Sequence, residues 1–142
     1  MIDIKDKKKV VAALNRALGW ELRAYAMYAH YAAYVKGLES LTLKGHFEEE
    51  ASESIGHAAK VRDIIALLGG VAATERDPKE IVHTEDHVEM LKEALKTETV
   101  AAQTYEKIIP LIKAHPVYMH TLMHIYMEEI SAVEEAKNLL GQ

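Results

Sequence analysis

The chain has 142 residues, which is enough for one domain with a buried core, and we expect a single domain over residues 1–142. Its net charge of −5, from 17 basic and 22 acidic residues, argues against nucleic acid as a main partner, because phosphate binding needs a basic face. The lack of cysteine excludes disulfides, thiolate catalysis and sulfur-rich metal sites. No apolar run reaches the ~18 residues of a membrane span. Residues 2–9 are charged and contain no apolar segment, so we expect a cytoplasmic protein with no signal peptide and no membrane partner.

Helix formers dominate the chain, and seven glycines and three prolines leave few breaks, so we predict an all-α protein. The first helix is expected from Asp6, as its N-cap, to residue 36, where Gly37 suits the left-handed position after a helix end. A second helix is expected over residues 40–70. Only a few residues separate the two helices, which predicts antiparallel neighbours.

A polar connection over residues 71–83 is long for a compact bundle, where links between helices usually have ~2–8 residues. A third helix is expected to begin near Thr84, and a fourth to follow the turn at Pro116. The short–long–short pattern of connections predicts two antiparallel hairpins joined by a long crossover. The expected apolar stripe of the third helix comprises Val88, Leu91, Leu95, Ala102, Tyr105, Ile109 and Ile112.

Polar side chains interrupt the apolar stripe of every predicted helix. In the second helix, Glu50, Ser54 and His57 fall on the stripe at about 100° per residue. The other three helices are interrupted by Glu21, Glu98 and Glu129. A buried charge without a partner costs several kcal/mol, so such groups are usually paired or bound to a metal. Any one of these glutamates alone would more often tilt toward solvent, but the set predicts a metal site inside a helical bundle.

The two halves of the chain repeat the same spacing. Glu21-x-x-Ala24-x-x-x-Tyr28 in the first helix corresponds to Glu98-x-x-Ala101-x-x-x-Tyr105 in the third. Residues 53–57 of the second helix correspond to residues 128–132 of the fourth. Agreement of both pairs, in the same order, is a stronger signal than either pair alone.

With these motifs the chain resembles the ferritin-like superfamily, nearest to bacterioferritins and related small ferritin-like domains, over residues 6–140. The resemblance implies a four-helix bundle whose di-iron site takes one Glu from each of two helices and a Glu-x-x-His from each of the other two. The positions that match this pattern are Glu21, His57, Glu98 and Glu129. Ser54 and Ala132 stand where the family has an acid and a histidine, so each half lacks one ligand.

The expected ligand set is therefore asymmetric. It comprises Glu21, Glu50, His57, Glu98 and Glu129. Such a set holds either one divalent ion or two ions weakly, and carboxylates with an imidazole suit iron, manganese or zinc. The resemblance implies that Tyr28 bonds to a ligand or passes electrons, although Tyr28 also fits a core aromatic whose hydroxyl needs a partner. Ile55 occupies the position of the family's haem-binding methionine, so we predict no haem.

Three functions remain open at this stage. The resemblance implies a protein that binds Fe(II), oxidises it with O₂ or peroxide, and stores iron. The two replaced ligand positions favour instead a binding module for a single metal ion. The third function is a metal-free scaffold whose acids are bridged by water, Arg23 or lysines. In each case we expect a homo-oligomer, a dimer or larger, with contacts through a face that carries Tyr31, Ala33 and Tyr34.

Overall fold

The computed structural model describes residues 4–142, and residues 1–3, which open the charged N-terminal segment, lie outside the described part. The chain forms α1 (Ile4–Tyr34), α2 (Ser40–Leu67), α3 (His87–Ile108), the short 3-10 helix η1 (Ile109–Ile112) and α4 (Pro116–Leu139). The described residues contain no strand. The predicted all-α class is confirmed.

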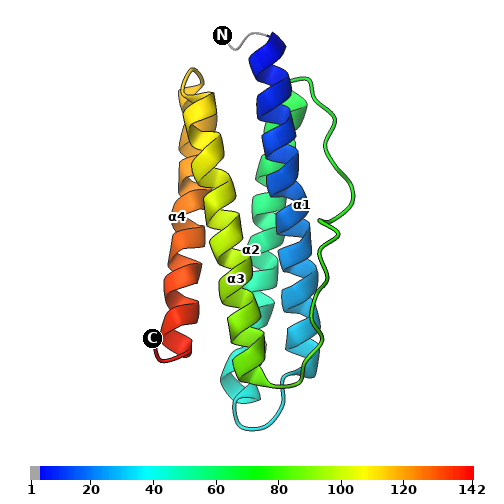
Figure 1. The fold of residues 1–142 in the computed structure, drawn as a ribbon, viewed down its shortest axis with the longest axis vertical. Helices are drawn as coiled ribbons and strands as arrows, with labels where there is room; N and C mark the ends of the chain where they lie inside the picture. Colours follow the sequence, from blue (N-terminus) through cyan, green and yellow to red (C-terminus); the bar gives the residue numbers. More distant parts are fainter. Residues whose placement is uncertain (1–3) are drawn as a thin grey trace.

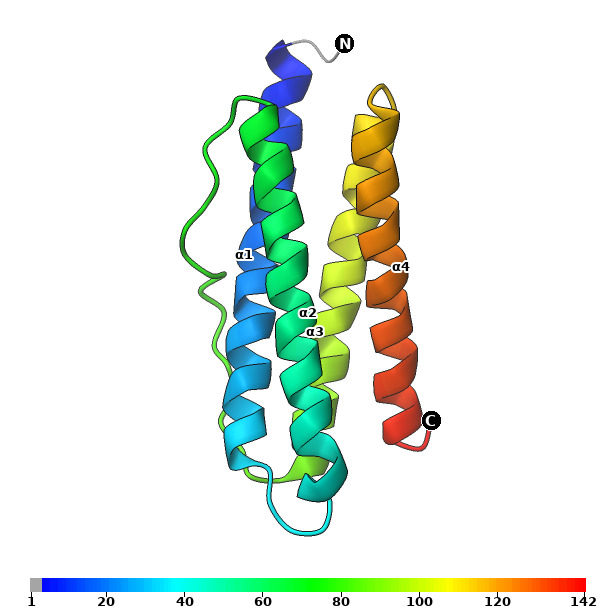
Figure 2. The ribbon, with the colours of Figure 1, turned by 180° about the vertical axis from the view of Figure 1, so that it is seen from behind.

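The four helices form two antiparallel hairpins, α1 with α2 and α3 with α4, which pack side by side (Figure 1). The connection from α2 to α3 runs back along α1 for most of the length of the bundle (Figure 2). α2 and α3 therefore run in the same direction, as the predicted crossover requires.

Individual residues explain where the helices begin and end. Gly37 and Gly69 lie after α1 and α2 with φ angles of 80° and 81°, a region that residues with a Cβ rarely adopt. Helix α1 begins before Asp6, so Asp6 lies in its first turn and is not the N-cap. Helix α3 begins later than predicted because Asp86, not Thr84, caps it by accepting a hydrogen bond of 2.9 Å from the N–H of Val88.

The long crossover is held against α1 by hydrogen bonds along its course. The side chain of Asn15 both donates to and accepts from its backbone, at 3.0 and 2.8 Å. The N–H of Asp77 donates to the carbonyl of Gly19 at 2.8 Å. A Cβ at position 19 would lie 3.4 Å from that nitrogen, which is an ordinary van der Waals contact. Further along, Arg23 donates to two carbonyls of the crossover, at 3.1 and 2.8 Å.

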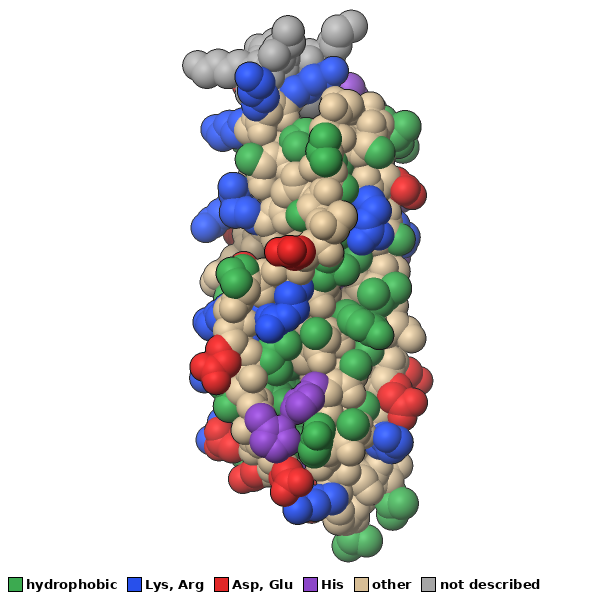
Figure 3. Space-filling view, turned by 90° about the vertical axis from the view of Figure 1, so that its right-hand side faces the viewer, with side chains coloured by type: hydrophobic (Ala, Val, Ile, Leu, Met, Phe, Trp, Pro, Cys, Tyr) green, Lys and Arg blue, Asp and Glu red, His purple; other side chains and the backbone are tan. Residues whose placement is uncertain are grey.

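The crossover also changes which residues of α1 are exposed. Tyr31 is fully buried, and its hydroxyl donates to the carbonyl of Val82 at 2.7 Å. The prediction that Tyr31 lies on an exposed contact face is therefore wrong, whereas Ala33 and Tyr34 are exposed. Charged side chains of both signs are interspersed on the side of the molecule that carries the crossover (Figure 3). Among the described helices, none combines the length and apolar character needed to cross a membrane.

The apolar core is divided into two clusters along the bundle axis. One contains Leu14, Leu18, Val61 and Ile65 among its members, and the other is built around Met27, Phe47 and Met90. The stripe of α3 differs from the prediction, because Val88 is 37% exposed and Leu95 is partly exposed. The residues of α3 that are buried instead are Met90, Ala94, Ala101 and Ile108. Between the two apolar clusters lies a layer of buried acids.

Candidate metal centre

One polar side chain from each helix reaches the middle of the bundle. The four are Glu21 from α1, His57 from α2, Glu98 from α3 and Glu129 from α4, and each is 4% exposed or less. Helical periodicity places these groups on apolar faces, and the antiparallel packing of two hairpins brings the four faces together. The structure thus brings together the four positions that matched the family pattern.

His57 lies at the centre of this cluster. Its Nδ1 atom lies 2.9 Å from Oε2 of Glu21 and 2.9 Å from Oε1 of Glu129. One ring nitrogen carries at most one proton, so it can donate a normal hydrogen bond to only one of these oxygens at a time. The three ligand atoms lie within 4.8 Å of one another, an arrangement that could hold a metal ion.

Two tyrosines orient the acids across the bundle in a reciprocal way. The hydroxyl of Tyr28 on α1 donates to Oε1 of Glu98 on α3 at 2.8 Å. The hydroxyl of Tyr105 on α3 donates to Oε2 of Glu21 on α1 at 2.9 Å. The repeated Glu-x6-Tyr spacing of the two halves therefore has a physical meaning, because each tyrosine serves the glutamate of the other half. Sequence reasoning singled out Tyr28 and treated Tyr105 as core, although the repeat already made the two equivalent.

Glu50 lies at the edge of the cluster, on the side where α2 faces α4. It is 9% exposed, and its carboxylate makes no hydrogen bond or ion pair with any other residue that the structure describes. Ser54, where the resemblance expects an acid, is buried on the same helix, while Ala132 lines a groove next to Glu50. The groove has a volume of about 190 Å³ and is lined by Glu50, Glu53, Glu128, Ser131, Ala132 and Glu135.

The outer nitrogen of His57 faces this groove. Nε2 lies 3.0 Å from Oε2 of Glu128 and 3.7 Å from Oε1 of Glu53. The other oxygen of Glu128 lies 2.7 Å from Nδ1 of His124. The fourth helix was expected to bury Glu129 alone among its acids, so the contact of Glu128 with His57 was not predicted. That contact depends on how α2 and α4 face each other, which the periodicity of one helix does not reveal.

Burial shifts the protonation of all these groups. It raises the pKa of Glu21, and it raises the pKa of Glu98 well above the ordinary value, with the neighbouring Glu129 adding to the shift at Glu98. Burial also raises the pKa of Glu50 to about 8 and that of Glu129 to about 7. Burial lowers the pKa of His57, but hydrogen bonds to Glu129 and Glu21 outweigh it and raise the value to about 11. With no cation present, the cluster therefore holds protons at neutral pH.

No lysine or arginine among the described residues is paired with these buried acids. Arg23 is buried, but its guanidinium donates to Thr97 and to the crossover, so the suggestion that it bridges the acids is wrong. If all were ionised, the carboxylates of Glu21, Glu50, Glu98 and Glu129 would carry four negative charges, which two divalent cations neutralise. Carboxylate oxygens with one imidazole nitrogen form a donor set that suits iron, manganese or zinc. The residues present thus fit a metal centre.

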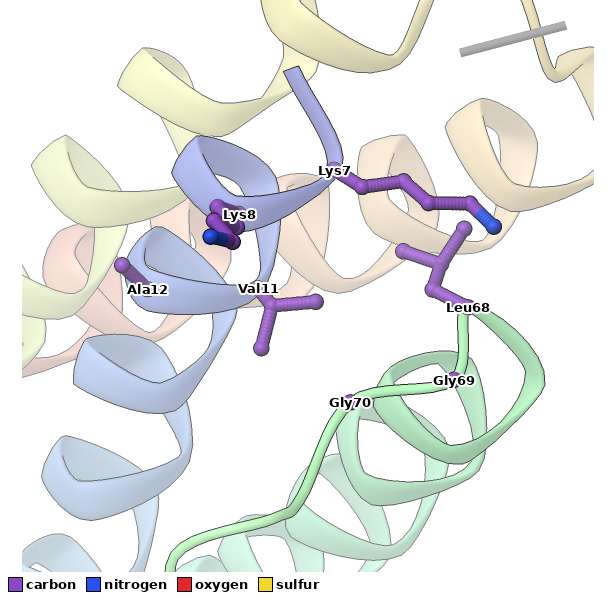
Figure 4. Close-up of a pocket in the computed structure, with 7 residues that line it drawn as sticks. All are labelled: Lys7, Lys8, Val11, Ala12, Leu68, Gly69 and Gly70. Atoms are coloured by element: carbon purple, nitrogen blue, oxygen red, sulfur yellow. The ribbon is translucent and has the colours of Figure 1, made fainter. Parts of the chain in front are cut away.

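A second pocket lies elsewhere and has a different character. It has a volume of about 460 Å³ and lies between the start of α1 and the end of α2. Figure 4 shows Lys7 and Lys8 above an apolar wall formed by Val11, with Gly69 and Gly70 on the facing segment. Lys8 is about 20 Å from Glu21 along α1, given ~1.5 Å of rise per residue. The lining contains no carboxylate or histidine, so this pocket offers no typical metal ligands.

A four-helix bundle of two hairpins around a buried cluster of carboxylates and a histidine defines the class of this protein, and comparisons with known proteins define its family. A family model described as a ferritin-like domain matches residues 11–142, and the chain belongs to this family. No match was found among curated proteins. A ferritin-like, diiron-carboxylate protein from Bacillus anthracis str. Ames is 31% identical, with 98% of this chain and 99% of that chain covered and a TM-score of 0.91.

Two further solved structures share this fold. The bacterioferritin-related protein from Bacteroides fragilis, described as a dodecameric thioferritin, is 27% identical, with 95% of this chain and 86% of that chain covered and a TM-score of 0.87. The DPS protein from Vibrio cholerae O1, described as a member of a broad superfamily of ferritin-like diiron-carboxylate proteins, is 16% identical. It covers 98% of this chain and 93% of its own with a TM-score of 0.91, and at that identity it supports the fold alone.

Proposed function

We propose that this chain binds Fe(II) in the centre of the bundle, oxidises it with O₂ or peroxide, and contributes to iron storage. The observation that carries the proposal is the position of His57 Nδ1, 2.9 Å from two buried carboxylates that no lysine or arginine among the described residues neutralises. The 31% identity to a diiron-carboxylate protein along nearly the whole chain supports the choice of iron.

The proposed ligands divide into two groups. Glu21, His57 and Glu129 would hold one ion, because their ligand atoms already converge. Glu98, which is hydrogen-bonded to Glu129, and Glu50 would supply carboxylates for a second ion. In this proposal Glu50 compensates in part for the ligands that Ser54 and Ala132 do not provide.

The residues around the ligands have a positioning role in this proposal. Glu128 would accept a hydrogen bond from Nε2 of His57, so that Nδ1, once a metal ion has displaced its proton, faces the centre as a ligand. Tyr28 and Tyr105 hold Glu98 and Glu21 through one oxygen each. Protons displaced by the cations leave through the groove, where burial raises the pKa of Glu53 to about 7 and suits it to accept them.

Fe(II) is the substrate in this reaction. Two Fe(II) ions supply two electrons, which together with two protons reduce O₂ to hydrogen peroxide and leave two Fe(III) ions. The carboxylates favour Fe(III) over Fe(II), because hard oxygen donors stabilise the more highly charged ion. Stopped-flow absorbance during aerobic addition of Fe(II) tests the proposal, since oxidation no faster than in buffer alone would remove its support.

A second candidate is a module that binds one metal ion without turnover. Ser54 and Ala132 favour it, because each replaces a ligand that the family pattern would provide. Anaerobic Fe(II) titration separates the two candidates. One equivalent bound per chain, together with oxidation at the rate of buffer, supports the module, whereas two equivalents and rapid oxidation support the oxidase.

We also propose a homo-oligomer. Tyr25 and Tyr34 on α1 are each 42% exposed, and they accompany the small exposed residues Ala29 and Ala33 on the same helix. A dodecamer is described for the relative from Bacteroides fragilis. Light scattering coupled to size exclusion measures the assembly, and a monomer at micromolar concentration would contradict the proposal.

A further inference from the structure

A second set of potential ligands lies outside the central cluster, where the first half of α2 faces the last half of α4. It consists of His46 and Glu50 on α2 and Glu135 on α4, and their ligand atoms lie within 4.8 Å of one another. Nδ1 of His46 lies 3.6 Å from Oε1 of Glu135. His46 and Glu50 are four residues apart on one helix, so they project from the same face toward α4.

The burial of Glu50 distinguishes this set from a group of exposed charges. Its side chain is nine-tenths buried and has no hydrogen bond or ion pair among the described residues, yet its carboxylate faces His46 and Glu135. Its oxygens open only onto the groove, and so deeply placed an acid with no cationic partner is costly. A cation between the three side chains would provide the missing partner.

We propose that His46, Glu50 and Glu135 form an outer site for a divalent transition-metal cation, which adjoins the central cluster and shares Glu50 with it. One imidazole nitrogen and two carboxylates match the preferences of zinc, manganese or ferrous iron. Glu135 is half exposed, so water can complete the coordination. The site does not depend on iron oxidation in the centre, although the two sites share Glu50.

The outer site lies on the groove that leads to the central histidine. Glu50 and Glu135 both line the groove that continues past Ala132 to Glu53 and Glu128, which contact His57. A cation bound at the outer site therefore lies at one end of a carboxylate-lined path whose other end is the central histidine. The side chain of Ala132 is only a methyl group, so it leaves this path open.

Zn²⁺ is a suitable probe, because it does not oxidise and its absorption edge locates it in a crystal. Metal-free full-length protein is titrated with Zn²⁺ by calorimetry, and crystals soaked with Zn²⁺ are measured at the zinc edge. The inference predicts anomalous density at about 2.1 Å from Nδ1 of His46. It also predicts that Glu135→Gln and His46→Ala each remove one equivalent of bound Zn²⁺ while density at His57 remains.

Glu134→Gln is the matched control. It makes the same change of charge at the neighbouring position of α4, where Glu134 forms only an exposed ion pair with Lys137, and it should leave the stoichiometry unchanged. Density at His57 with none at His46, or an unchanged stoichiometry in Glu135→Gln, would overturn the inference. Density at His46 with none at His57 would instead support the outer site and contradict the proposed central function.

Discussion

Replacing Glu98 by glutamine separates the role of this residue in folding from its role in metal binding. The amide has the shape of the carboxyl group, so it can still accept the 2.8 Å hydrogen bond from Tyr28 and can donate to Glu129. Burial raises the pKa of Glu98 well above its ordinary value and so favours the neutral form of the wild-type side chain in the metal-free protein. The free energy of unfolding of the metal-free variant should therefore lie within about 1 kcal/mol of wild type.

The metal-bound states should differ much more. A ligand that binds only the folded state at 100 times its Kd stabilises the protein by about 2.7 kcal/mol. For a domain of this size that corresponds to a rise in Tm of about 10 °C. Glu98→Gln should lose most of this rise, because a neutral amide replaces a buried anionic ligand next to Glu129.

Thermal unfolding followed by circular dichroism, with EDTA and with Mn²⁺, measures both quantities. Glu106→Gln is the control, because Glu106 is an exposed acid on the same helix and should leave both Tm values unchanged. A variant that is strongly destabilised without metal, yet still gains the full rise in Tm with metal, would refute the reasoning.

Four further predictions follow from the same geometry. Without metal, the free energy of unfolding measured in urea titrations should fall as pH rises from about 5 to 8. Glu50 and Glu129 have pKa values of about 8 and 7 in the folded protein, so they keep protons that the unfolded chain has already released. A free energy of unfolding that rises over this range would contradict the prediction. Binding of Mn²⁺ at pH 7 should release on the order of two protons per chain, measured by calorimetry in buffers of different ionisation enthalpy, and no buffer dependence would count against carboxylate ligation. Tyr28→Phe and Tyr105→Phe should each weaken metal binding by about tenfold in equilibrium dialysis, and an effect of only one of them would break the predicted equivalence. Purified protein should show no Soret band, since Ile55 is an exposed aliphatic residue where haem would need a methionine.

The convergence of acids could be predicted from the sequence because helical periodicity fixes which side chains share a face. Glu21, His57, Glu98 and Glu129 fall on apolar stripes, and each is buried in the structure. The repeat between the two halves of the chain predicted which helices correspond, which the apolar stripe of a single helix cannot predict. The reciprocal hydrogen bonds of the tyrosines could have been predicted from the same repeat.

Other contacts depend on the rotation of one helix against another, which periodicity does not determine. Glu128 and Glu135 lie outside the apolar stripe predicted for α4, yet Glu128 contacts His57 and Glu135 faces His46. Tyr31 was predicted to be exposed, but the crossover covers it and accepts its hydrogen bond. The course of a long connection cannot be predicted from helical periodicity. Arg23 was considered as one possible bridge between the acids, but it donates hydrogen bonds to that connection instead.

The central claim is tested most directly by crystals loaded anaerobically with Fe(II) and measured at the iron edge. The account predicts iron bound by Nδ1 of His57 and by the carboxylates of Glu21 and Glu129, with a second ion near Glu98. Empty density there, with His57 still 2.9 Å from both glutamates, would contradict it and leave a bundle whose acids are held by protons alone.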